Sequence, residues 1–132
     1  MAKTLESAQK ELKALDLSYY GELPQHKKHL EIVLNNLEEN EEIKAMVYGI
    51  HKRMSYLICA TDSQIVCGNK PLMGKQKEMQ IKMDDIKSIS LKSGFLSGSS
   101  IILSQKNGTE LKFNSDEKKN ITKFVNAAST LV

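Results

Sequence analysis

The sequence predicts an α+β, mainly β fold: seven antiparallel strands closed by a C-terminal helix and preceded by an N-terminal helical hairpin. Three observations predict it. Apolar residues recur at helical spacing before residue 43, short apolar runs between turn residues follow, and a last helical stripe ends the chain. At 132 residues the chain fits one domain, which buries roughly two-thirds of its unfolded surface without needing a disulfide or a metal.

Residues 1–42 are predicted to form an acidic helical arm. Apolar residues from Leu5 to Leu15 recur at three- and four-residue intervals, so they share one stripe of a helix. Pro24 suits the first turn of a second helix, whose own stripe extends over residues 25–39. Neither helix buries its stripe alone. The arm therefore needs a surface to pack on, either the domain that follows or a second copy of the chain.

Residues 43–132 are predicted to form the strand domain. Met79 and Ile81 alternate with Gln80 and Lys82, which places one strand face inward and a lysine-bearing face outward. The other runs show similar signals. We expect strands at about 44–52, 55–61, 64–69, 77–83, 87–94, 99–106 and 109–114.

Turn residues and a final helix complete this domain. Asn107-Gly108 predicts a type I′ hairpin turn, because both residue types tolerate positive φ. Asp84-Asp85 predicts a tight turn. Ile121 and the apolar residues after it, up to Ala128, fall on one helical stripe, so one helix of about fifteen residues closes the domain.

Charge is unevenly spread along the chain. Residues 1–42 carry five lysines against nine acids, a net charge of −4, whereas residues 43–132 carry fourteen basic residues against seven acids, a net charge of +7. Either the two parts pack together and neutralise each other, or the basic face meets an anionic partner. The chain has a single arginine, the residue best suited to planar phosphate recognition, so no nucleic-acid partner is expected.

Three stretches resemble the YokE-like bacterial PH (pleckstrin-homology) domains. YLICATDSQIVCGNK looks like that family's second and third strands, and MQIKMDDIKSISLKSGFLSGSSIIL looks like its next strands and hairpin. GTELKFNSDEKKNITKFVNAA looks like its last strand and closing helix. Together they cover about residues 43–130, and the chain departs from the family's pattern at Ser63 and Gln64. The resemblance implies a PH-like barrel or sandwich, a fold that hosts many unrelated roles.

No constellation for catalysis, a cofactor or a metal is evident. His26 and His29 lie three apart on one helical face, but no acid or cysteine completes a metal site, so a solvated helix face is the favoured interpretation. Cys59 and Cys67 are interpreted as two small buried apolar residues. Neither a phosphate-cradling glycine loop nor a nucleophile elbow is present, and no small-molecule substrate is expected.

Two groups of residues remain as candidate contacts. The candidate anion contacts are Lys52, Arg53, Lys70, Lys75 and Lys77. The candidate partner or membrane contacts are Phe95, Leu96, Leu72 and Met73. Phe95 and Leu96 lie between glycines at a hairpin tip, where they either fold back onto the core or form an exposed apolar knob.

The sequence therefore favours a non-catalytic binding module for protein–protein interaction or self-assembly, with a homo-oligomer as one form. The alternative is peripheral binding to an anionic membrane or a phosphate-bearing ligand through the basic surface. The chain lacks a signal-peptide pattern and any apolar run of ~20 residues, so a cytoplasmic location is expected.

Overall fold

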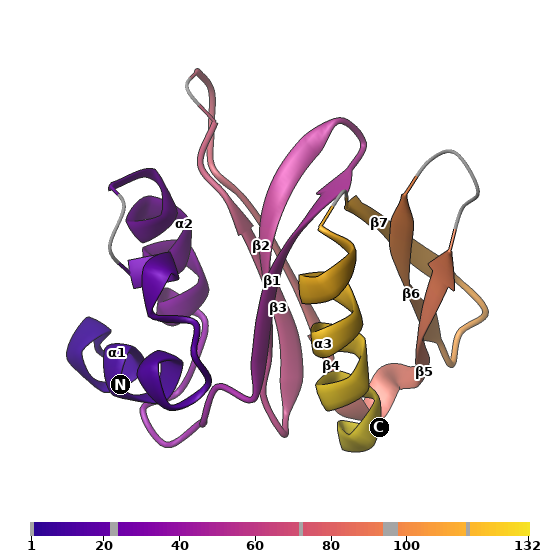
Figure 1. Ribbon diagram of the computed structural model, residues 1–132, viewed down its shortest axis with the longest axis horizontal. Helices are drawn as coiled ribbons and strands as arrows, with labels where there is room; N and C mark the ends of the chain where they lie inside the picture. The colour runs from indigo at the N-terminus through magenta and orange to yellow at the C-terminus, as the bar shows by residue number, and fades with distance from the viewer. Residues whose placement is uncertain (1, 22–23, 72, 94–97, 116) are drawn as a thin grey trace.

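The computed structural model describes residues 2–21, 24–71, 73–93, 98–115 and 117–132. Its centre is one seven-stranded antiparallel sheet with the strand order β4-β3-β2-β1-β7-β6-β5. The two halves of this sheet diverge, and the C-terminal helix α3 lies between them, while the N-terminal helices lie on the far side of β1–β3 (Figure 1). The predicted α+β, mainly β class is confirmed.

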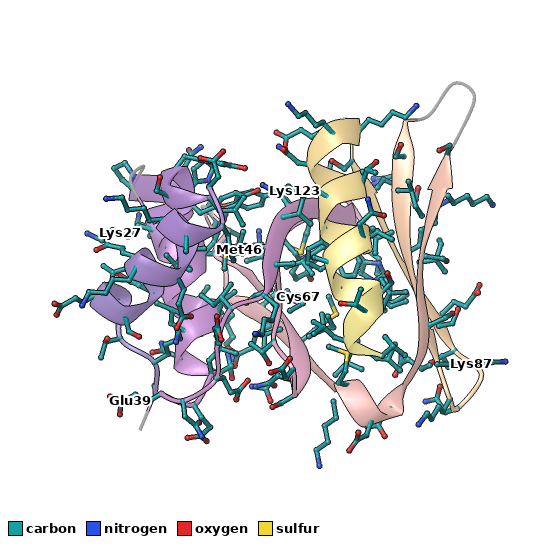
Figure 2. All side chains as sticks on the ribbon, turned by 60° about the horizontal axis from the view of Figure 1, so that its bottom comes forward. Lys27, Glu39, Met46, Cys67, Lys87 and Lys123 are labelled. Carbon is teal, nitrogen blue, oxygen red and sulfur yellow. The ribbon has the colours of Figure 1, made fainter. Side chains whose placement is uncertain are left out.

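Every strand begins and ends within one residue of its predicted bounds. The edge strands β4 and β5 carry outward lysines, including Lys87 (Figure 2), which discourage pairing with other chains. The strands are β1 (Ala45–His51), β2 (Met54–Ala60), β3 (Gln64–Asn69), β4 (Lys77–Lys82), β5 (Ile86–Ser93), β6 (Ser99–Gln105) and β7 (Glu110–Ser115).

Helix α3 (Lys118–Ala128) packs on the inner face of the sheet. Its predicted stripe is buried there, with Ile121 and Ala128 fully enclosed, against strand residues such as Ile101 and Phe113. The short 3₁₀ helix η3 (Ser129–Leu131) continues it. This inner core closes the strand domain, as the amphipathic pattern of the last segment predicts.

The N-terminal arm packs on the opposite face of β1–β3 within the same chain. It consists of α1 (Leu5–Ala14), the 3₁₀ helix η1 (Ser18–Gly21) and α2 (Pro24–Asn35). Its leucines form a second core with the outward side chains of the strands, among them Met46, Leu57 and Val66. With helices on both faces, β2 and β3 are buried almost continuously rather than in alternation.

Hydrogen bonds fasten the arm to the strand domain. The buried Lys3 ammonium lies 2.6 Å from Glu11 Oε2 and 2.8 Å from the Glu41 carbonyl oxygen. Glu11 Oε1 accepts from the Ile43 N–H at 2.9 Å, and Gln64 Nε2 donates to Glu41 Oε1 at 3.0 Å. A further bond joins the arm to α3, where the Lys123 ammonium (labelled in Figure 2) donates to the Leu15 carbonyl at 3.2 Å. These contacts fix the arm in one position on the sheet.

The two cysteines are free thiols on opposite faces of the sheet. Cys67 pairs with Ile58 and Cys59 with Val66, so neighbouring strands do not bring the two sulfurs opposite each other. Cys67 lies in the inner core and Cys59 in the core beneath the arm. Burial raises the pKa of the Cys67 thiol to about 12 and that of Cys59 still further. Their interpretation as small buried residues is confirmed.

Two local predictions are wrong. Helix α2 ends at Asn35 rather than reaching Glu39, because the Asn36 side-chain amide donates to the Ile32 carbonyl at 2.9 Å and the chain turns there. Leu37 of the predicted stripe is nevertheless buried.

The second error concerns the hairpin turns. Gly108 has a φ of 92°, but Asn107 does not share it, and the Gly108 N–H bonds the Gln105 carbonyl at 3.0 Å. This is a longer loop ending in a left-handed glycine, not a type I′ turn. Positive φ at two successive residues occurs instead at Lys52 (50°) and Arg53 (68°), between β1 and β2.

Candidate functional site

An open cleft of about 500 Å³ lies where the first half of α2 faces β1 and β2. A shallower cleft of about 200 Å³ continues from it along Ile50 to Asn114 on β7. The two share Tyr48, Ser55 and Glu117. The larger cleft is lined by Gln25, His26, His29, Tyr48, Ser55, Asn69, Lys70 and Glu117.

A tyrosine between two histidines forms one wall of the cleft. The Tyr48 hydroxyl lies 2.8 Å from His26 Nδ1 and 2.9 Å from His29 Nδ1. The spacing of three along α2 places both imidazoles over β1, and the Tyr20 ring packs edge-on against Tyr48, with ring centroids 5.5 Å apart. The triad is therefore held by α2, β1 and η1 together.

The tautomers of the two imidazoles decide which groups donate in the triad. A phenol has one proton, so it donates to one Nδ1 atom and accepts from the other. One histidine therefore presents an Nδ1–H to Tyr48, and the other presents an Nδ1 lone pair.

Burial favours the neutral forms of His29 and Tyr48. Loss of solvation lowers the pKa of His29 below its usual 6.5, opposed by the Lys70 carbonyl and assisted by the neighbouring His26. Loss of solvation also raises the pKa of the Tyr48 phenol far above its ordinary value. Around neutral pH His29 and Tyr48 are thus neutral hydrogen-bonding groups.

Asn69 at the end of β3 adds an acceptor without a partner. Its side-chain Nδ2 donates to the Ser55 carbonyl at 2.6 Å, which ties β3 to β2. The residue is only 7% exposed, and its Oδ1 has no hydrogen-bond partner in the described part of the chain. Leaving a buried acceptor unpaired costs about 1–3 kcal/mol. Asn69 is part of the cleft lining, but its Oδ1 atom has almost no exposed surface.

Gly68 sets the distance between α2 and the sheet. A Cβ atom at this position would lie 2.9 Å from Ile32 Cγ2 and 3.3 Å from the His29 carbonyl oxygen. Only glycine lets the helix backbone approach β3 so closely. The resulting contact positions His29 above Tyr48 and thereby shapes the cleft.

Comparison with protein-family models matches residues 37–130 to the family described as Bacterial PH domain. The chain belongs to this family. The match covers all seven strands and α3, and it leaves α1 and α2 outside. A search among curated proteins found no match. The YokE-like subgroup suggested by the sequence stays a prediction.

The cleft of this bacterial PH domain is therefore composite. Tyr48, Ser55, Asn69 and Lys70 belong to the part that matches the family, whereas Gln25 and both histidines come from the arm. Families of this kind are binding modules, and the wall added by the arm is a feature of this chain beyond the matched region.

The structure scatters the predicted anion contacts. Lys52 and Arg53 form an exposed two-residue turn, and Lys75 and Lys77 are exposed beyond β3. Lys70 is the member of the group that lines the cleft. The five predicted anion contacts do not line one common cavity among those found in the described residues. Their role in binding an anion stays a prediction.

The predicted apolar contacts lie mostly outside the described residues. Leu72, Phe95 and Leu96 lie outside the described residues. Whether Phe95 and Leu96 fold back onto the core or form an exposed apolar knob is therefore not decided. Met73 is described and is 90% exposed, in the β3–β4 connection at the same end as the β1–β2 turn (Figure 1).

The prediction of a solvated histidine face is wrong. Both rings are half-buried and bonded to Tyr48, which sequence reasoning missed because its partner lies on another element. One signal was present: Tyr48 interrupts the apolar run Ala45–Ile50 with a hydroxyl group. Within the described ranges no three His, Cys, Asp or Glu side chains gather as a metal site. No helix of those ranges has the length and apolarity to span a membrane.

Proposed function

We propose that this bacterial PH domain is a non-catalytic protein-binding module whose partner, another protein or a second copy of the chain, docks in the cleft beside Tyr48. The observation that carries the proposal is the lining of the cleft. It offers hydrogen-bonding side chains from the triad, Ser55 and Asn69, together with the Glu117 carboxylate and the Lys70 ammonium. Polypeptide surfaces supply matching groups of both kinds.

The positions of the cations also support a protein partner. A phosphate site gathers several cationic or N–H donors around one point. In this domain Lys52 and Arg53 form an exposed two-residue turn outside the cleft, and the cleft lining holds one cation, Lys70, and one carboxylate, Glu117. The cleft therefore has no net positive charge to attract an anion.

A second candidate function rests on a different observation. Met73 is 90% exposed beside Lys75 and Lys77, and the Lys52–Arg53 turn projects at the same end of the molecule. An apolar side chain among lysines suits the interface of an anionic membrane, where each lysine contributes about 1 kcal/mol. We keep peripheral membrane binding as the alternative.

Site-specific photo-crosslinking tests the proposal. A benzoylphenylalanine replaces Ser55, which is exposed and lines the cleft, and the full-length chain is irradiated in cells of its source organism. We expect a discrete crosslinked protein, identified by mass spectrometry as a partner or as this chain itself. The matched control carries the same group at Ser90, an exposed residue on β5 far from the cleft.

Identical crosslinks from both positions, or none from Ser55, would contradict the proposal. Cosedimentation with vesicles containing about a third anionic lipid, at low and at moderate salt, tests the alternative. Salt-sensitive pelleting that is lost in the double variant Lys75→Gln/Lys77→Gln would favour the membrane function over the protein-binding one.

A further inference from the structure

We infer that His26, His29 and Tyr48 form a pH-sensitive latch, which holds the first half of α2 on the sheet at neutral pH and releases it in acid. The latch joins α2 to β1, because the Tyr48 hydroxyl lies 2.8 Å from His26 Nδ1 and 2.9 Å from His29 Nδ1. The inference goes beyond the proposed function, because it concerns how one wall of the cleft is held and not what binds there.

The single proton of the phenol makes the latch depend on a neutral histidine. Tyr48 donates that proton to one Nδ1 atom, so the imidazole there carries a lone pair on Nδ1 and its only proton on Nε2. An imidazolium carries a proton on both nitrogens. Protonation of this imidazole therefore replaces the acceptor by an N–H, which ends the bond in which the phenol donates. The conclusion is the same whichever of the two histidines is the acceptor.

The place of both histidines in α2 opposes a positive charge as well. Helix α2 begins at Pro24, so His26 lies in its first turn and His29 in its second. The N–H groups at the start of a helix form the positive end of its dipole, which disfavours a cation there. Both rings are half-buried, and loss of solvation lowers the pKa of His29 in the same direction. The closed arrangement therefore opposes protonation of the pair.

Charged groups from the other elements act on the latch in both directions. Lys70, which follows β3, lines the same cleft and disfavours an imidazolium, whereas Glu117, which precedes α3, favours one. Both side chains are exposed, as are Lys27 and Lys28 on α2, so solvent screens their effect. Tyr20 of η1 packs edge-on against the latch and stays neutral, because burial raises its pKa. The exposed charges oppose one another, so the histidines decide the direction of the effect.

Release of the latch uncovers part of the core beneath the arm. Leu30 and Val33 follow the histidines on α2 and are completely buried in one core with the outward side chains of the strands, among them Leu57 and Val66. When the first half of α2 lifts from the sheet, these side chains and the helix amides meet water. Acid therefore changes the shape of the cleft and exposes apolar surface at the same place.

The size of the effect follows from proton linkage. In the open state a released histidine titrates at about 6.5, whereas the closed state keeps the accepting histidine neutral. The closed arm is thus fully stable above this pH and loses stability as the pH falls below it. The equilibrium constant for opening should rise about tenfold between pH 7.5 and pH 5.5 if one histidine must stay neutral, and about a hundredfold if both must.

Amide hydrogen exchange of the full-length chain at pH 7.5, 6.5 and 5.5 measures the opening of α2, with each rate divided by the intrinsic exchange rate at that pH. We expect the opening constant of α2 to rise about tenfold or more from pH 7.5 to pH 5.5, while β6 stays better protected than α2 throughout. The double variant His26→Gln/His29→Gln should reduce the rise to less than about twofold. His51→Gln, at a histidine of β1 that bonds the Lys112 carbonyl outside the arm, is the matched control and should keep the full rise.

Imidazole ¹⁵N NMR of the full-length chain reads the latch directly, and it decides the question even if the double variant does not fold. At pH 7.5 one latch histidine should carry its proton on Nε2 and the other on Nδ1. The titration midpoint of the first should move to higher pH in Tyr48→Phe, which lacks the phenol proton. The same tautomer at both histidines, an unchanged midpoint in Tyr48→Phe, or equal protection of α2 and β6 at every pH would overturn the latch.

Discussion

Replacing Gly68 by alanine should partly separate the arm from the strand domain. The added Cβ would lie 2.9 Å from Ile32 Cγ2, 3.1 Å from Ile32 Cβ and 3.3 Å from the His29 carbonyl oxygen. The last two atoms belong to the helix backbone or its first branch, so α2 must move as a whole. Overpacking of this kind costs about 1–3 kcal/mol. The smaller freedom of alanine in the unfolded chain returns about 0.4–1 kcal/mol.

The midpoints of these two ranges give an expected net loss of about 1.3 kcal/mol in the free energy of unfolding. With a denaturant slope of about 2 kcal/mol/M, the urea midpoint should fall by roughly 0.5–1 M. The amide signals of Tyr48 and Ser55 should shift with it, because the histidines move away from the sheet. Urea unfolding followed by far-UV circular dichroism measures the first effect, and an amide NMR spectrum measures the second.

Gly21→Ala is the matched control. Its Cβ would meet its nearest atom, Gln9 Cγ, at 3.5 Å, an ordinary contact, and its φ is not in the left-handed region. We expect no loss of stability there. If Gly68→Ala unfolds at the same urea concentration as the wild type, the close approach of α2 to β3 is refuted, and with it the positioning of His29.

Three further predictions concern stability. The double variant Lys52→Asn/Arg53→Gly should raise the free energy of unfolding by about 1 kcal/mol, since it relieves positive φ at both turn residues; a fall in the urea midpoint would contradict the turn geometry. Glu11→Gln should lower the free energy of unfolding by about 2–3 kcal/mol, because the Lys3 ammonium is then buried without its carboxylate. An unchanged urea midpoint would mean that Lys3 reaches water. Finally, burial raises the pKa of Cys67 from 9.0 to about 12, so the folded chain keeps a proton that the unfolded chain loses. Between pH 9 and 10 the wild type should lose about 1 kcal/mol more stability than Cys67→Ala, and parallel pH profiles would argue against a buried thiol.

The strand bounds could be predicted because alternation and turn residues act locally. In β4 and β7 the more covered residues alternate with exposed ones, and that period of two is visible in the sequence. The continuous apolar runs Tyr56–Ala60 and Ile65–Gly68 carry a further signal. They indicate burial on both faces, and the arm provides the second cover.

The cleft could not be predicted, because its chemistry depends on packing. His26 and His29 acquire their roles from the hydroxyl group of Tyr48, about twenty positions away. The place of the turn at Lys52-Arg53 follows from the expected strands, but its conformation could not be predicted, because the full register of β1 with β2 imposes positive φ on two residues that do not favour it. In both cases tertiary geometry overrides the local preference.

The central claim is that a protein partner binds in the cleft beside Tyr48. The most direct test is the yield of the crosslink from Ser55 in the full-length chain, with Ser90 as the background position. We predict a discrete crosslinked protein from Ser55, while the Ser90 position stays at background. A Ser55 position that captures no more than Ser90 would contradict the claim.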